Sequence, residues 1–167
     1  MIVTVVSEGR HAAKDALAER LALLRGARGR RVLLMDADPC HLHGASHVPV
    51  RAVSGKGVQA ELENLGQRFQ DIVVDAANRD SLGSRAALIG ANVVVVPAEG
   101  LDGDGPAAAR LAERIGNARL FNPGMRIVIV PAGPSRAGRF MCGCLPAARL
   151  LEESGDDSLY AAVFPPD

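Results

Sequence analysis

The chain has 167 residues, a formal net charge of zero at pH 7 and 48% hydrophobic residues. At this length we expect one globular domain over residues 1–167. Zero net charge argues against a general affinity for nucleic acids or anionic membranes. The sequence holds no apolar run of about 18 residues, so no membrane-spanning helix is predicted. Three cysteines are too few for a disulfide framework, which favours a cytoplasmic protein.

Six apolar segments predict β-strands. Most are rich in valine and isoleucine and lack the alternation of a half-exposed strand, a pattern typical of parallel strands that are buried on both faces. In chain order they are residues 1–6, 31–39, 71–75, 92–97, 126–130 and a short last strand at 159–164.

Segments of helical periodicity lie between these strands. In chain order they are residues 16–24, 58–69, 81–91, 106–118 and 145–154. Because strand and helix alternate, the sequence predicts an α/β fold, a mostly parallel sheet with helices on both faces. The arginine-rich segment 25–31, which follows the first helix, is predicted to be a solvated turn.

Acidic residues end two of the predicted strands. Asp36 and Asp38 close the second strand, and Asp75 closes the third. In an open α/β sheet the carboxyl ends of the strands face the ligand crevice. These three acids are therefore candidate site residues.

The first strand, the turn after it and the following helix form the usual setting of a phosphate-binding loop. Such a loop needs glycines where backbone amides crowd the phosphates. Here Arg10, His11, Ala12 and Ala13 stand in that place. The setting favours nucleotide binding, whereas the loop residues argue against it.

An ordered set of segments resembles the ParA/MinD group of P-loop ATPases, with the greatest similarity to ParA-type plasmid and chromosome partition proteins. The segments are Ser7-Glu8 and residues 36–39, 71–75, 78–81, 91–97 and 121–124. The resemblance runs from Met1 to about Phe164. It implies the P-loop NTPase fold, in a form that is short at its C-terminal end.

Set against the family's K-G-G-x-G-K-[TS]-T loop, this chain departs at nearly every functional position. Gly9 stands at the signature lysine, Arg10 and His11 at the paired glycines, Ala13 at the third glycine and Asp15 at the magnesium-binding threonine, while Lys14 alone matches. Where a replaced glycine had positive φ, an L-residue would cost about 1–2 kcal/mol. The resemblance therefore implies that ATP binds weakly or not at all in the usual mode.

The same resemblance assigns candidate roles. Asp36 and Asp38 match acids that serve the metal and the attacking water, and Asp75 matches the Walker B acid. Candidate cofactor-binding positions are Gly9, Arg10, Lys14 and Asp15, and the weak candidate magnesium ligands are Asp15, Asp36 and Asp75. We favour a different interpretation, an internal ion network in which Lys14 or Arg10 neutralises these acids. Pro131 and Ala132 also replace the asparagine that contacts the base in the family.

The implied function is that of a ParA-like protein that hydrolyses ATP very weakly or not at all. It would act as partner or regulator in DNA partition, plasmid maintenance or subcellular positioning, beside a ParB-like protein or an intact ParA-type ATPase. Neither the family's basic C-terminal helices nor MinD's membrane helix is found, which argues against direct DNA or membrane binding. A homodimer is left open. The alternative is a divergent but active Mg-ATPase.

A second alternative, a metal-binding or redox module, depends on thiol and imidazole groups. Cys40, His41, His43 and His47 lie close together, and Cys142 and Cys144 follow much later. Such groups are preferred ligands of zinc, nickel and copper. Their spacing matches no structural zinc pattern, so a solvated histidine-rich loop is favoured.

Overall fold

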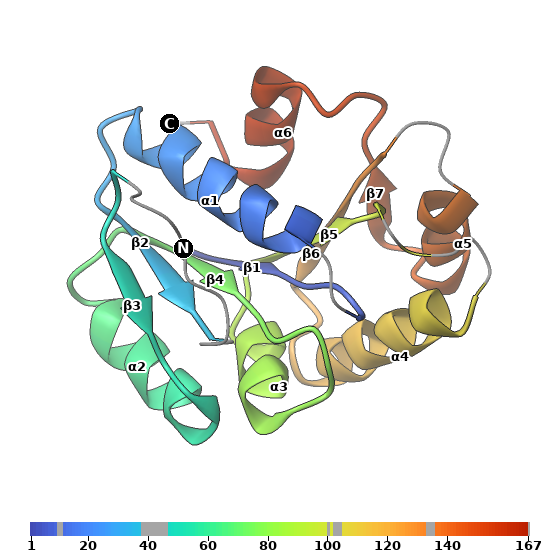
Figure 1. The fold of residues 1–167 in the computed structure, drawn as a ribbon, viewed down its shortest axis with the longest axis horizontal. Helices are drawn as coiled ribbons and strands as arrows, with labels where there is room; N and C mark the ends of the chain where they lie inside the picture. Colours follow the sequence, from blue (N-terminus) through green and yellow to red (C-terminus); the bar gives the residue numbers. More distant parts are fainter. Residues whose placement is uncertain (10–11, 38–46, 100, 102–104, 133–135, 167) are drawn as a thin grey trace.

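A seven-stranded sheet, parallel throughout, forms the centre of the molecule (Figure 1). The computed structural model describes residues 1–9, 12–37, 47–99, 101, 105–132 and 136–166. The strands are β1 Ile2–Val5, β2 Val32–Asp36, β3 Val50–Ala52, β4 Asp71–Asp75, β5 Val93–Pro97, β6 Arg126–Val130 and β7 Ala148–Leu150. Their order in the sheet is β3-β2-β4-β1-β5-β6-β7. The predicted parallel α/β sheet is confirmed.

Helices cover both faces of this sheet, as predicted (Figure 1). They are α1 Ala12–Gly26, the 3-10 helix η1 Gly55–Gly57, α2 Val58–Leu65, α3 Leu82–Ile89, α4 Pro106–Phe121, α5 Arg136–Cys144 and α6 Asp156–Val163. The first and last helices, α1 and α6, pack on one face, and α2 to α5 pack on the other. Among the helices described, none is both long and apolar enough to cross a lipid bilayer.

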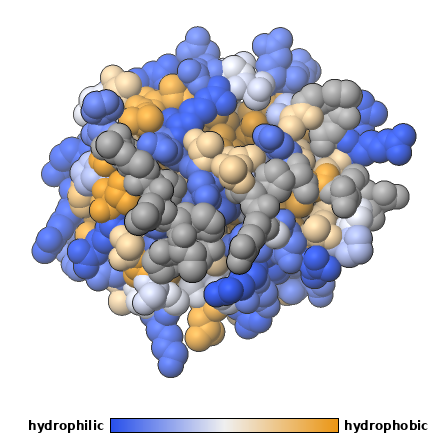
Figure 2. All heavy atoms as spheres, in the orientation of Figure 1, coloured by the Kyte–Doolittle hydropathy of each residue, from blue (hydrophilic) through white to orange (hydrophobic). Residues whose placement is uncertain are grey.

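Each face of the sheet has its own apolar core. Side chains of β1 such as Val3 and Val5 pack with α1 and α6, whereas Ile72 and Val74 of β4 pack under α2 and α3. All five residues of β4 are buried, as expected for a central parallel strand. On the face seen in Figure 2, hydrophilic residues form most of the rim and hydrophobic residues appear in small groups.

The predicted helix at 145–154 is wrong. Helix α5 ends at Cys144, and the following segment pairs with β6 as β7, with Ile127 opposite Ala148. Alanine, leucine and glutamate favour a helix locally, but pairing at the open edge of the sheet outweighs that preference. Helix α5 itself was missed because Gly138 and Gly143 weaken its helical pattern.

The predicted strand at 159–164 is wrong as well, because this segment lies within and just after α6. Asp156 and Asp157 occupy the first turn of that helix, where their negative charges interact favourably with the positive end of the helix dipole. At the other end, Arg126 donates to the carbonyls of Ala162 and Val163. Strand β3 was not predicted, because its three residues are exposed and carry no apolar run.

The solvated-turn prediction for 25–31 is wrong at its first residue. Arg25 is buried, and its Nε donates to Asp71 Oδ2 at 2.9 Å, while Arg30 Nε donates to the same oxygen at 3.1 Å. Arg25 also donates to the hydroxyl of Tyr160, and its guanidinium carbon lies 4.8 Å from the ring centre of Phe164. Arg25 therefore joins α1, β4 and α6 at the end of the sheet where the strand β4 begins.

Candidate functional site

Three strands bring their carboxyl ends together at the edge where the predicted site acids lie. Val5, at the end of β1, pairs with Asp75 at the end of β4, and Asp36 at the end of β2 pairs with the same residue. Both aspartates are buried. The structure thus places Asp36 and Asp75 side by side.

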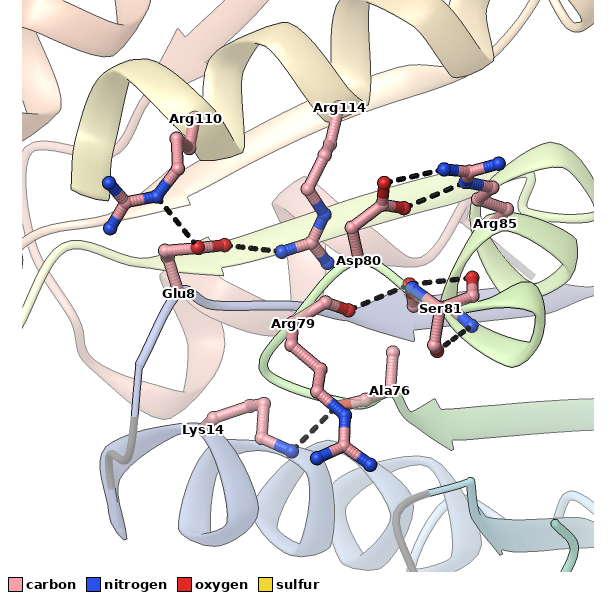
Figure 3. Close-up of polar contacts among 10 residues, drawn as sticks. Glu8, Lys14, Ala76, Arg79, Asp80, Ser81, Arg85, Arg110 and Arg114 are labelled. Carbon is pink, nitrogen blue, oxygen red and sulfur yellow. Dashed lines mark hydrogen bonds and ion pairs between the residues drawn. The ribbon is translucent and has the colours of Figure 1, made fainter. Parts of the chain in front are cut away.

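Helix α1 delivers Lys14 to these acids. The helix begins at Ala12, four residues earlier than predicted, so that Lys14 and Asp15 lie in its first turn. The Lys14 side chain is 1% exposed, and its Nζ lies 2.6 Å from Asp75 Oδ1 and 3.3 Å from Asp15 Oδ1. It also donates to the carbonyl of Ala76 at 2.6 Å (Figure 3). This is the pairing expected from an internal ion network.

The turn between β1 and α1 is tied to the segment after β4. Gly9 has a φ of +79°, a backbone conformation that L-residues rarely adopt. Its amide donates to the carbonyl of Asn78 at 3.1 Å. This backbone conformation explains why a glycine stands at the position of the family's signature lysine.

Several predicted site residues lie outside the described residues. They are Arg10 and His11 of the loop, Asp38 after β2, and Cys40, His41 and His43 of the histidine-rich segment. His47 is described, as are Cys142, which is half-buried, and Cys144, which is exposed; neither cysteine forms a disulfide. Within the described part of the chain, no three His, Cys, Asp or Glu side chains gather as a group that could hold a metal ion.

The carboxylate of Glu8, which was not among the predicted site residues, lies in the segment that follows β1. Glu8 Oε1 accepts from Arg110 Nε at 3.1 Å, and Glu8 Oε2 accepts from Arg114 Nη1. Figure 3 shows both arginines reaching from α4 toward Glu8. Arginines four residues apart share one face of a helix. This spacing is the signal in the sequence that could have indicated a common partner for the two arginines. Their partner is far away in sequence and could not be read from spacing.

A second ion pair follows β4. Arg85 Nε and Nη2 donate to the two carboxylate oxygens of Asp80 at 2.7 and 2.6 Å. These hydrogen bonds hold the pKa of Asp80 below its ordinary value, so the residue is an anion near neutral pH. Ser81 and Ser84 form a reciprocal capping box that begins α3 directly after this acid. The segment between β4 and α3 is therefore held by several polar contacts.

A cavity of about 320 Å³ opens between the first turns of α1 and the carboxyl ends of β5 and β6. Its lining includes Ala13, Arg20, Glu99, Pro131 and Ala132. The last two are the residues that stand where the family has a base-contacting asparagine. Neither carries a side-chain amide that could recognise a base.

No protein-family model matches this sequence, and no curated protein matches it. Solved structures do. A cobyrinic acid a,c-diamide synthase from Mycobacterium smegmatis, with bound ATP analog and magnesium, is 12% identical; the match covers 95% of this chain and 89% of that one, with a TM-score of 0.66.

Two further solved structures are similar over most of their length. The cell division ATPase MinD of Pyrococcus furiosus is 16% identical, with 93% of this chain and 83% of that chain covered and a TM-score of 0.61. A plasmid partition protein from Borrelia burgdorferi is 14% identical, with 93% and 90% covered and a TM-score of 0.58. At such identities the likeness shows a shared fold.

Proposed function

We propose, from the fold that this chain shares with ParA/MinD-type P-loop ATPases, that the protein is a ParA-like relative with a degenerate phosphate-binding loop. It hydrolyses ATP very weakly or not at all. It acts as a partner or regulator in DNA partition, plasmid maintenance or subcellular positioning, in the reducing cytoplasm that its few cysteines suit.

The observation that carries this proposal is the position of Lys14. Its ammonium lies 2.6 Å from Asp75, whose side chain is 0% exposed. A nucleotide phosphate would have to draw the ammonium away from that buried carboxylate. Breaking a buried ion pair costs about 3–5 kcal/mol. That cost would be subtracted from the free energy of nucleotide binding.

Magnesium fits this arrangement poorly. The candidate ligands Asp15 and Asp75 both lie against the Lys14 ammonium, at 3.3 and 2.6 Å. A magnesium ion needs its oxygen ligands at about 2 Å, so it would lie next to a buried positive charge. The residues as placed therefore do not suit the ion, and no hydrolytic step is assigned to Asp36 or Asp75.

Protein partners are proposed on the same basis. One similar solved structure is a complex of MinC with MinD from Aquifex aeolicus, and another is a plasmid partition protein. We propose a ParB-like protein or an intact ParA-type ATPase as the partner, without direct DNA or membrane binding.

The test measures whether ATP binds. With magnesium and millimolar ATP, the melting temperature should rise by less than about 1 °C. A ligand stabilises a protein appreciably only when its concentration exceeds its dissociation constant. Sedimentation velocity should give the same coefficient with and without ATP. A clear rise in melting temperature that Lys14→Ala abolishes, or dimer formation on adding ATP, would contradict the proposal.

That contrary result would favour the second candidate, a divergent but active Mg-ATPase. The observation in its favour is that Lys14, Asp36 and Asp75 meet at the edge of the sheet where the nucleotide of a P-loop protein lies. In that case ATP hydrolysis should be measurable and should disappear in the Lys14→Ala variant.

A further inference from the structure

A groove runs between α3 and α4, beside the loop that carries Glu8. Its volume is about 310 Å³. Two kinds of side chain line it, charged or polar groups and apolar groups. The polar set is Asp80, Arg85, Arg114 and Asn117, and the apolar set includes Ile89 and Phe121. We call this the α3–α4 groove.

Arg114 is the unusual residue of the groove. Its side chain is only 10% exposed, and one nitrogen, Nη1, bonds to Glu8. The other two nitrogens, Nε and Nη2, are buried and have no hydrogen-bond partner among the described residues. A buried donor without an acceptor costs about 1–3 kcal/mol, and more when it carries charge. An acceptor from outside the chain would remove that cost.

The charges around Arg114 leave a positive excess. Two guanidinium groups, those of Arg85 and Arg114, line the groove together with one carboxylate, that of Asp80. Figure 3 shows Arg114 between Glu8 and the Asp80–Arg85 pair. Both carboxylates are already engaged by arginines. The groove therefore suits one further negative charge.

The apolar wall of the groove is unusually open. Phe121, at the end of α4, is 75% exposed, and Ile89, at the end of α3, is 41% exposed. Large exposed apolar side chains next to a buried arginine are typical of protein interfaces, where aromatic residues and arginine contribute most of the affinity.

We infer that the α3–α4 groove is the docking site for a segment of a partner protein that carries an acidic side chain next to an apolar one. The carboxylate pairs with the guanidinium of Arg114, which turns toward the groove because its Nε and Nη2 are closed to solvent in this structure. The apolar side chain covers Phe121 and Ile89. A nucleic acid is a poorer occupant, because its phosphates would meet Glu8 and Asp80 and would leave the apolar wall exposed. The inference does not depend on the proposed function.

The experiment selects ligands without assuming a partner. Short random peptides displayed on phage are panned on the full chain, and the enriched peptides are synthesised and their affinity is measured by fluorescence anisotropy. We expect a shared pattern of aspartate or glutamate close to leucine, isoleucine or an aromatic residue. Arg114→Gln should weaken binding by about tenfold or more, equal to about 1.4 kcal/mol. Phe121→Ser should weaken it as well.

Arg110→Gln is the matched control. Arg110 also binds Glu8 from α4, but it does not line the groove, so its loss should change affinity by less than about twofold. Circular dichroism of each variant checks that the fold is kept. Enriched peptides that lack acidic residues, equal effects of the two arginine variants, or Arg114-dependent binding of a fluorescent DNA oligonucleotide in place of the peptides would each overturn the inference.

Discussion

The chain contains two lysines, and their environments are opposite. Lys56 is exposed on η1, whereas Lys14 is one of the most deeply buried side chains of the protein. A buried ammonium is tolerated only when a carboxylate and further acceptors replace its hydration shell. Asp75 and the carbonyl of Ala76 supply these contacts. At the scale of single residues, Lys14 is therefore part of the folded core.

We expect Lys14→Met to lower the free energy of unfolding at neutral pH by about 3 kcal/mol, because it breaks the buried ion pair between Lys14 and Asp75. Urea denaturation measures this change. Adding Asp75→Asn to the same variant should restore part of the loss, since the buried negative charge is then removed. Lys56→Met is the matched control and should have little effect. A loss below about 1 kcal/mol for Lys14→Met would show that the pair is not structural.

The sequence identified part of this site. Lys14 and Asp75 were found through their positions relative to a predicted strand and a family motif. The contacts of Glu8 with Arg110 and Arg114 were missed, since no local pattern links a turn residue to a helix so much later in the chain. Such pairs depend on how helices pack on the sheet, and this becomes visible only in three dimensions.

At the scale of elements, α5 and β7 lie unusually close together. A Cβ atom on Gly138 would lie 2.8 Å from Leu150 Cδ1 and 3.6 Å from Ile129 Cγ2. The glycine thus lets the helix approach the edge of the sheet. The close approach explains why a residue with poor helix propensity occupies the third position of α5.

We expect Gly138→Val to lower the free energy of unfolding by about 1–3 kcal/mol, because the added atoms would collide with the Leu150 side chain, which would have to move aside. Thermal or urea denaturation measures the change. Gly143→Val is the matched control on the same helix. A Cβ atom there meets nothing within 4 Å, so only the helix-propensity difference, below about 1 kcal/mol, should appear. Equal effects at the two positions would contradict the packing argument.

Elements set by local sequence were predicted correctly, whereas elements set by contacts with distant parts of the chain were not. The strands 71–75 and 126–130 were predicted with the observed bounds, because a continuous apolar run is a local property. The predictions for the region after Val130 were mostly wrong. There the edge pairing of β7 and the packing of α6 against α1 decide between helix and strand. A sequence window contains neither contact.

At the scale of the whole molecule, Asp71 joins distant parts of the chain. Burial alone would raise its pKa, but the hydrogen bonds from Arg25 and Arg30 outweigh burial and hold the pKa of Asp71 below its ordinary value. A lowered pKa means that folding favours the ionised form. This stabilisation is present above the unfolded pKa and is lost as the pH falls through the folded one.

We therefore expect the free energy of unfolding of the parent protein to fall as the pH drops below about 4, the ordinary pKa of an aspartate. Asp71→Asn should be less stable than the parent at neutral pH, and the difference should shrink in acid. Urea denaturation at both pH values tests this. Asp157→Asn, at a fully exposed partner of Arg28, is the control and should change the pH dependence much less than Asp71→Asn does. Parallel curves for the parent and Asp71→Asn would contradict the expectation.

The central position of β1 has a consequence for how the protein is made. Val3 pairs with Val73 on one side and with Val93 on the other. Strand β1 leaves the ribosome before both of these partners and has neither of them until β4 and β5 have been translated. Such distant pairings slow folding, and an unpaired apolar strand invites association with other chains. During synthesis, Ile2–Val5 should thus be the segment that most needs protection by a chaperone.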